Sequence, residues 1–354
     1  MLFILLIVVS SNILFAQKKK KSKAEKAAKK YKNIVVSITN NYLPYMYQRV
    51  INENYCGPDC YKSYSGGKYI PWNMKVNKKI VYDNIGSIIH ESVHGFNKGP
   101  SRHTRGSEFL KFTHRILVSP YKFIDYEGKD VIKSYTIVDD ILENNPKIAD
   151  LFRFDTYIGD NRNTSANVSG IYGLLEEFSA YYHGCNTSFI LYNNVKNTSK
   201  FDDYLLPEQS IWGGDSIDIN GSIVYPDSIA KKRQYLLTSL ATDCMGHYAS
   251  YYEFNIFIGA YLKYTKTHLP GMYYDILNNN QFRYAYKMID DNFSKLVIRM
   301  EKEFGNGFKP YKDSGITYRS GVKNRDLGKE IIVDYKDILN EFRNLHGIVQ
   351  YESE

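Results

Sequence analysis

The sequence predicts an α+β fold in which a mixed core is followed by a mainly helical C-terminal subdomain. Three observations support this prediction. β-Branched runs at residues 33–38 and 79–82 are typical of short strands. Apolar residues at helical spacing in residues 85–97 and 170–184 indicate two core helices. From residue 227 to about residue 304, and again near the C-terminus at 333–347, the pattern is mostly helical.

Shorter elements complete this fold. Residues 107–118 and 134–154 are expected to form helices, and a polar loop at residues 160–169 leads into the second core helix. The chain just after residue 200 is loop-rich. We therefore expect a core at residues 33–200 and a helical subdomain at residues 201–354.

The N-terminus predicts export. Residues 1–16 are mostly apolar, and this run is shorter than the roughly 20 residues that cross a bilayer. We expect a signal peptide cleaved near Ala16, with an uncleaved membrane anchor as the alternative. No later segment is apolar enough to predict a membrane span. A secreted, periplasmic or cell-surface protein is therefore expected.

A lysine-rich linker follows at residues 17–32. Nine lysines lie between Lys18 and Lys32, and charges at this density resist burial, so we expect a disordered or loosely helical segment. The linker also explains the net charge of +8, since the rest of the chain is close to neutral. No nucleic-acid-binding motif is visible, and we expect no nucleic-acid partner.

Four cysteines follow the apolar N-terminal run. An even number in an exported chain predicts two disulfide bonds. The favoured pairs are Cys56–Cys60, which closes a short turn, and Cys185–Cys244, which would join the second core helix to the C-terminal subdomain. Free buried cysteines are the alternative.

The most specific motif is His90-Glu91-Ser92-Val93-His94, which reads H-E-x-x-H within the first core helix. Residues four apart share one helix face, so His90 and His94 can direct two imidazole nitrogens at one metal ion. Glu91 can then reach a water molecule at that ion. Two neutral imidazoles favour zinc, and a catalytic zinc ion keeps three protein ligands and one open position.

The surrounding residues predict a buried helix. Its apolar face is supplied by Ile85, Ile88, Ile89, Val93 and Phe96. Asp83 or Asn84 can cap the start, and Gly95 with Asn97 can form the end. Gly86 lies one turn before the first histidine, where a small residue would let a neighbouring helix or strand come close.

Two adjacent acids in the second core helix are candidates for the third ligand. A carboxylate among apolar residues is costly to bury unless it binds a metal or a cation. Glu177 has Gly173 and Ala180 on its face, which would allow close packing on the H-E-x-x-H helix, and it is the favoured ligand. Glu176 is the alternative, and its own face carries Tyr172, Ser179 and His183.

The H-E-x-x-H helix resembles the active-site helix of the zincin metallopeptidases. The resemblance implies that His90 and His94 are zinc ligands and that Glu91 is the general base. The metzincin subclass is not expected, because Asn97 and Pro100 stand where its pattern requires Gly and His. The nearby His103 lies in a polar stretch and is expected at the surface.

The second helix is similar to the third-ligand helix of gluzincins, whose third ligand is a Glu on a second helix. In the aminopeptidases of that group this helix reads Asn-Glu-Gly-Phe-Ala, and aligning its Ala with Ala180 implies that Glu177 is the ligand. This chain departs from the thermolysin type at Tyr181, where that type has Asp. Its interval from His94 to Glu177 is also longer than in either group, so no specific family is assigned.

Enzymes of this kind add a Tyr or His that hydrogen-bonds the developing oxyanion. The candidates are His183, His247, Tyr248 and Tyr251. The resemblance therefore implies a zincin-like core, with the active cleft between its two lobes, and an exported zinc metallopeptidase. It would hydrolyse a peptide or protein substrate by a zinc-activated water, with Glu91 as general base. The alternatives are a non-catalytic exported surface protein, such as a glycan-binding one, or a zinc amidase acting on cell-wall peptides.

Overall fold

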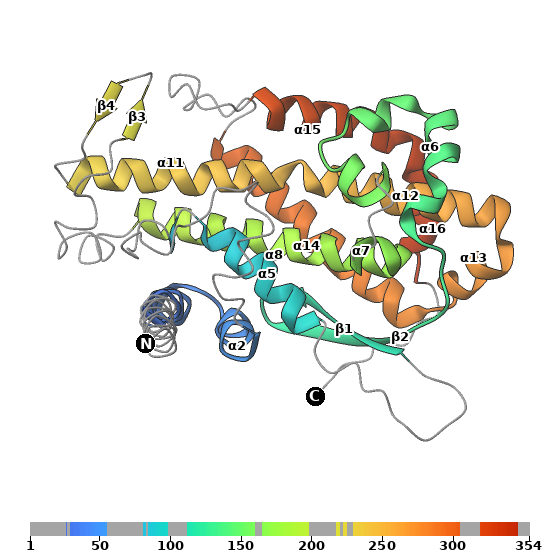
Figure 1. The fold of residues 1–354 in the computed structure, drawn as a ribbon, viewed down its shortest axis with the longest axis horizontal. Helices are drawn as coiled ribbons and strands as arrows, with labels where there is room; N and C mark the ends of the chain where they lie inside the picture. Colours follow the sequence, from blue (N-terminus) through green and yellow to red (C-terminus); the bar gives the residue numbers. More distant parts are fainter. Residues whose placement is uncertain are drawn as a thin grey trace, which may run out of the picture.

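Helices dominate the structure, and two small antiparallel hairpins accompany them (Figure 1). The computed structural model describes residue 26 and residues 29–54, 81–82, 84–97, 112–159, 165–197, 217–219, 222–224, 229–304 and 319–345. Its α-helices are α2 (Tyr45–Asn54), α5 (Ile85–Asn97), α6 (Val138–Asn144), α7 (Ser165–Val168), α8 (Gly170–Asn197), α11 (Ile229–Tyr248), α12 (Ser250–His268), α13 (Pro270–Leu277), α14 (Asn280–Phe304), α15 (Arg319–Ile331) and α16 (Lys336–Arg343). The strands are β1 (Phe112–Ser119), β2 (Lys122–Gly128), β3 (Ile217–Ile219) and β4 (Ser222–Val224). This architecture fits a helix-dominated α+β class.

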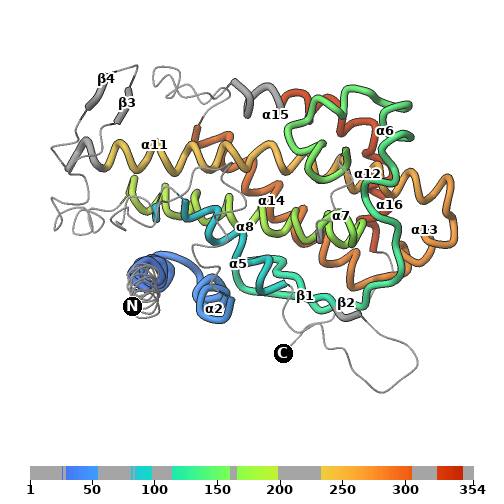
Figure 2. The backbone as a smooth tube through the Cα atoms, in the orientation of Figure 1, coloured from blue at the N-terminus to red at the C-terminus, as the bar shows by residue number. Residues whose placement is uncertain are grey.

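Helix α8 is the central element. It crosses the middle of the molecule in Figures 1 and 2, and α5, α11, α12, α14 and β1 pack against it. Buried residues occur on all of its faces from Ile171 to Val195, as expected for a helix that other helices enclose. One hydrophobic core joins elements before and after residue 200. The domain boundary at that residue stays a prediction.

Two glycines let α5 and α8 approach each other closely. A Cβ atom at Gly184 would lie 2.8 Å from the carbonyl oxygen of Gly86 and 3.4 Å from the Cβ of His90. A Cβ atom at Gly86 would lie 2.6 Å from Ser188 Oγ on α8, which confirms the expectation that Gly86 admits a neighbouring element. The helix end predicted at Gly184 is wrong, because this glycine serves close packing and α8 continues to Asn197.

The start of α8 depends on a third glycine. Gly170 has a φ of 53°, a left-handed conformation that suits glycine at the junction of α7 and α8. The polar loop predicted at residues 160–169 is wrong where α7 forms. A Cβ at Gly173 would collide with the backbone of Ala166 in α7, so this glycine faces α7 and not the H-E-x-x-H helix.

The helix predicted at residues 107–118 is wrong in its described part, which forms β1. This strand pairs antiparallel with β2, and Ile116 lies opposite Ile124. The two strands are rich in β-branched and aromatic residues, and only Pro120 and Tyr121 separate them. Hydrogen bonding to a strand so close in sequence outweighs the helical periodicity of this apolar run.

Side chains from both core helices hold β1 at one residue. The N–H of Leu117 donates to Asn97 Oδ1 of α5 at 3.0 Å. Its carbonyl oxygen accepts from Ser179 Oγ at 2.7 Å and from His183 Nε2 at 2.9 Å, both on α8. These bonds fix the hairpin relative to α5 and α8.

The strands predicted near the N-terminus are also wrong. Residues 29–42 form a helix across the range predicted as a strand at 33–38, and residues 81–82 are helical within the range 79–82. The buried side chains of the N-terminal helix recur at helical spacing and are Tyr31, Val35, Ile38 and Thr39. Burial of this single stripe outweighs the β-propensity of the Ile and Val residues.

The helical prediction for the second half of the chain is confirmed over residues 229–304 and, as a 3₁₀ turn followed by α16, over residues 333–343. Residues 344–345 are not helical, and α15 is a helix that the sequence pattern did not predict. The helix predicted at 134–154 is divided into 3₁₀ turns at Ser134–Ile137 and Pro146–Asp150, with α6 between them. Proline lacks a backbone N–H and starts a new turn here, and Asn145 caps that turn by accepting from the N–H of Lys147. A π-helical turn follows at Asp155–Gly159.

Cys185 and Cys244 are buried free thiols in the structure, not the disulfide that the sequence predicts. They are nevertheless neighbours, because the Cys185 Sγ lies 3.7 Å from the carbonyl oxygen of Cys244. The Cys56–Cys60 pair, the apolar segment 1–16 and His103 lie outside the described residues.

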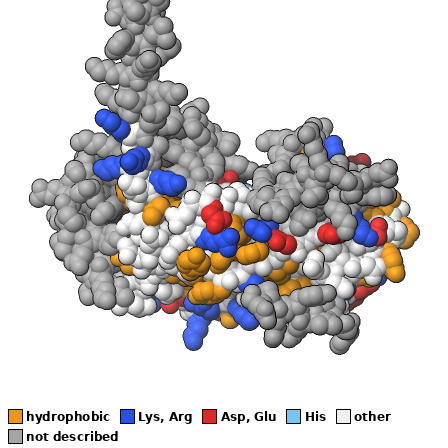
Figure 3. Space-filling view, turned by 90° about the horizontal axis from the view of Figure 1, so that it is seen from below, with side chains coloured by type: hydrophobic (Ala, Val, Ile, Leu, Met, Phe, Trp, Pro, Cys, Tyr) orange, Lys and Arg blue, Asp and Glu red, His pale blue; other side chains and the backbone are white. Residues whose placement is uncertain are grey.

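The described surface carries charges of both signs. Figure 3 shows Lys and Arg side chains grouped near the N-terminal helix, and elsewhere on this face they are interspersed with acidic ones. Residues 29–32, the end of the predicted linker, belong to that helix. Within the described ranges, no helix combines the length and hydropathy that crossing a bilayer requires.

The contact between α5 and α8 predicts the effect of filling it. Gly184→Ala should destabilise the protein by about 1–3 kcal/mol, because the added methyl group meets backbone atoms that cannot move aside independently. Urea unfolding would measure this loss. Gly246→Ala in α11 is the matched control, since nothing lies within 4 Å of its added Cβ. Equal stabilities of the two variants would contradict the packing argument.

Candidate metal centre

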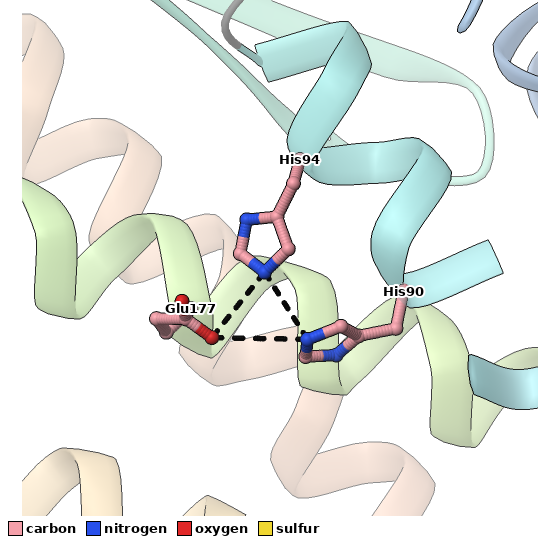
Figure 4. Close-up of side chains that lie close together, drawn as sticks. All are labelled: His90, His94 and Glu177. Carbon is pink, nitrogen blue, oxygen red and sulfur yellow. Dashed lines mark hydrogen bonds and ion pairs between the residues drawn. The ribbon is translucent and has the colours of Figure 1, made fainter. Parts of the chain in front are cut away.

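Three buried side chains converge between α5 and α8. His90 and His94 lie one turn apart on α5, and their Nε2 atoms are 3.1 Å apart. The Oε2 atom of Glu177 on α8 lies 3.3 Å from His94 Nε2 and 3.7 Å from His90 Nε2. Figure 4 shows the three side chains directed at one point. The structure therefore brings together the three ligands that the sequence predicts.

The spacing of these atoms fits a metal ion. Ligand atoms about 2.0–2.1 Å from a tetrahedral ion lie about 3.3 Å from one another. The observed separations of 3.1, 3.3 and 3.7 Å lie on both sides of that value. Two imidazole nitrogens and one carboxylate oxygen are a donor set that divalent transition metals accept. This buried His-His-Glu group could therefore bind a metal ion.

A tyrosine holds the carboxylate of Glu177. The hydroxyl of Tyr157 donates to Glu177 Oε2 at 3.0 Å and lies 3.3 Å from the hydroxyl of Tyr181. Tyr157 comes from the π-helical turn, a local widening that is frequent at functional sites. The hydrogen bond offsets part of the cost of burying the charged oxygen.

Glu176 lies on the opposite side of His94. Its Oε1 atom is 3.3 Å from His94 Nδ1, the ring nitrogen that faces away from the three converging atoms. The two adjacent acids of α8 therefore contact different nitrogens of one imidazole. Ser179 and His183, which the sequence places on the face of Glu176, both bond to β1.

Glu91 is placed beside the centre and not within it. Its Oε1 atom lies 4.0 Å from His90 Nε2, and its side chain is 16% exposed. The carboxylate is thus near the converging atoms while solvent still reaches it. A carboxylate beside the converging atoms could exchange a proton with a water molecule there.

The two histidines differ in their affinity for protons. Burial, followed by the neighbouring His94 and His247 rings, holds the pKa of His90 well below its ordinary value. Burial also disfavours the charged form of His94, but Glu177 and Glu176 outweigh it and raise the pKa of His94 well above its ordinary value. In the metal-free protein, His90 is therefore neutral and His94 holds a proton at neutral pH.

Three of the four residues predicted as oxyanion candidates lie in structural positions. Both ring nitrogens of His183 are occupied, Nδ1 by the Tyr47 hydroxyl at 2.9 Å and Nε2 by the Leu117 carbonyl. Burial lowers the pKa of His183 to about 3. Tyr248 donates to Glu301, and Tyr251 packs edge-on against an aromatic ring of α14. Each of these three side chains is thus held by structural contacts.

His247 is the candidate that lies beside the centre. Its ring centroid is 6.4 Å from that of His90 and 5.6 Å from that of Tyr181. Its Nδ1 atom is 2.8 Å from the carbonyl oxygen of Asp243, which can only accept, so the proton is on Nδ1. Among the described residues, no hydrogen bond is found at the other ring nitrogen, Nε2.

Sequence reasoning did not assign Tyr157, Tyr181 or Arg153 to the site. The Cζ atom of Arg153 lies 4.4 Å from the centre of the Tyr181 ring, and its guanidinium donates to Glu253 at 2.6 Å. Tyr181 follows Glu177 by one helical turn, so helix spacing could have identified it. Arg153 and Tyr157 carry no recognisable motif, and only the tertiary fold brings their segment to α8.

Comparison with known proteins identifies no relative of this chain. No protein-family model matches the chain, and no curated protein or solved structure is significantly similar to it. The site is therefore interpreted from its own geometry.

The raised pKa of His94 predicts that metal binding releases a proton. Binding of one divalent ion near neutral pH should displace about one proton, so the affinity should rise with pH by about tenfold per unit until the His94 pKa is passed. Calorimetric titration in buffers of different ionisation enthalpy measures this proton. A binding enthalpy that does not depend on the buffer would contradict the prediction.

Proposed function

We propose that the protein is a zinc-dependent metallopeptidase with a gluzincin-type ligand set of His90, His94 and Glu177. The observation that carries the proposal is the convergence of two imidazole nitrogens and one carboxylate oxygen at tetrahedral spacing. This donor set, with one position left open, is typical of catalytic zinc in hydrolases. The order of ligands along the chain, with Glu on a second helix, supports a zincin-like catalytic core.

The chemistry is divided between the ion and the protein. Bound zinc supplies Lewis acidity that activates a water molecule near neutral pH. Glu91 accepts the proton of this water and delivers it to the leaving amine of the scissile peptide bond. Its position 4.0 Å from His90 Nε2, together with its partial exposure, supports this role.

His247 is proposed to stabilise the charge that develops on the substrate carbonyl oxygen. Its Nδ1 is anchored on the carbonyl of Asp243, which leaves Nε2 as the ring nitrogen that can act on a substrate, and its ring centroid lies 6.4 Å from that of His90. When Nε2 carries a proton it can donate to the developing oxyanion. The Asp243 carboxylate, with Oδ1 3.6 Å from His247 Nδ1, would balance the resulting positive charge.

The proposed substrate is a peptide or protein outside the cytoplasm. The apolar run at residues 1–16 and the cleavage site expected near Ala16 are the sequence features that support export. The same site chemistry would also serve a zinc amidase that acts on cell-wall peptides. Digestion of casein and of peptidoglycan by the purified protein distinguishes these two substrates.

Replacement of the general base tests the mechanism. Glu91→Gln should retain one zinc ion per chain and lower the rate of peptide hydrolysis by at least about 10²–10⁴-fold, because the amide cannot accept the proton. Metal analysis and peptide-cleavage kinetics measure the two quantities. Glu143→Gln, at an exposed position on α6, is the matched control and should remain fully active.

The outcomes of this experiment separate the proposed classes. Full activity in Glu91→Gln would overturn the mechanism. One zinc ion per wild-type chain that His90→Ala removes supports the metal site. A wild-type protein that binds zinc but cleaves neither casein nor peptidoglycan would instead favour a non-catalytic surface protein.

The role of His247 predicts a separate effect on turnover. His247→Asn should lower kcat by about 10²–10³-fold and leave the zinc content unchanged, because the ring acts on the transition state and does not bind the ion. Steady-state kinetics with metal analysis measures both. Tyr251→Phe, in the adjacent core, is the control and should retain kcat. A wild-type kcat in His247→Asn would assign the oxyanion role to another group.

A further inference from the structure

We propose that Glu176 is a positioning residue of the metal centre, which orients the His94 ring by accepting a hydrogen bond from its Nδ1–H. The inference rests on the proposed function, because it concerns the same metal ion. It also assigns different roles to the two adjacent acids of α8. Glu177 is a ligand, and Glu176 holds the ligand His94.

The geometry of His94 carries this assignment. Nδ1 lies 3.3 Å from Glu176 Oε1, while Nε2 lies 3.3 Å from Glu177 Oε2. A carboxylate at Nδ1 favours the tautomer with the proton on that nitrogen. The lone pair of Nε2 is then available on the side where the other two ligand atoms lie. The negative charge of Glu176 also makes the imidazole a stronger donor.

The other histidine ligand has no carboxylate at its second ring nitrogen. Among the described residues, Nδ1 of His90 has no side-chain hydrogen-bond partner, and the polar group that acts on this ring is the backbone of Ala180. Packing also holds the ring, because its edge contacts Tyr181 at a centroid distance of 4.5 Å. Loss of Glu176 should therefore affect one of the two imidazoles selectively.

Glu176 is suited to hold a charge in this position. Its side chain is 18% exposed, so water solvates part of the carboxylate. On the protein side it acts electrostatically on His114 and Tyr126, which stack on each other with ring centroids 5.2 Å apart. Glu177, by contrast, is 4% exposed and directs its oxygen at both histidines.

The test measures metal affinity and not activity. The full-length chain is freed of metal and titrated with zinc against a chromophoric chelator. Glu176→Ala should bind one zinc ion with about 10–100-fold lower affinity, the usual effect of losing an outer hydrogen-bond partner. Glu176→Gln should lose less, because its amide oxygen still accepts the Nδ1–H bond. Glu143→Ala removes an exposed acid of α6, a helix that supplies no residue of the site, and should bind zinc as the wild type does.

A spectroscopic measurement locates the effect. In zinc-loaded protein with ¹⁵N-labelled histidine, Glu176→Gln should shift the Nδ1 resonance of His94 and leave that of His90 in place. Wild-type affinity in Glu176→Ala, or an equal loss in Glu143→Ala, would overturn the proposal. If the alanine variant does not fold, an unshifted His94 resonance in Glu176→Gln overturns it instead. A wild-type chain that binds no zinc would overturn the proposed function itself, whereas retained zinc with an unaffected Glu176→Ala overturns only the role of Glu176.

Discussion

The close contact between α5 and α8 is the constraint on which the metal centre depends. Gly86 and Gly184 lie at this contact, and a single added Cβ at Gly184 would meet the opposing backbone at 2.8 Å. The approach of the two backbones brings side chains from both helices within ligand distance of one another. The other helices around α8, together with the hydrogen bonds at Leu117, hold the pair in this arrangement.

Buried charge is the second determinant of the site. Two imidazoles and a carboxylate would be costly to enclose without partners. The structure offsets this cost with local hydrogen bonds, from Tyr157 to Glu177 and between His94 and Glu176. Beyond them, the cation of Arg153 lies over the ring of Tyr181 and pairs with Glu253. The centre is thus embedded in a polar network that extends from α8 to α12.

The success of sequence reasoning varied with the range of the interactions involved. The helix at Ile85–Asn97 and the pairing of His90 with His94 on one of its faces followed from local spacing, because residues four apart on a helix lie together. The strand predicted at residues 33–38 failed because packing of a single helical stripe outweighed β-propensity. The helix predicted at 107–118 failed because the pairing partner of β1 lies outside the segment itself.

The sequence by itself determined which residues could hold a metal ion and on which helix faces they lie. It left open whether Glu176 or Glu177 is the third ligand. It also left open which of the four oxyanion candidates lies beside the metal centre. Tertiary structure decided both questions, because helix rotation and crossing are set by contacts such as those of Gly86 with Gly184. These contacts lie far apart along the chain, so no local pattern encodes them. The same long-range packing brought Tyr157 and His247 to the centre.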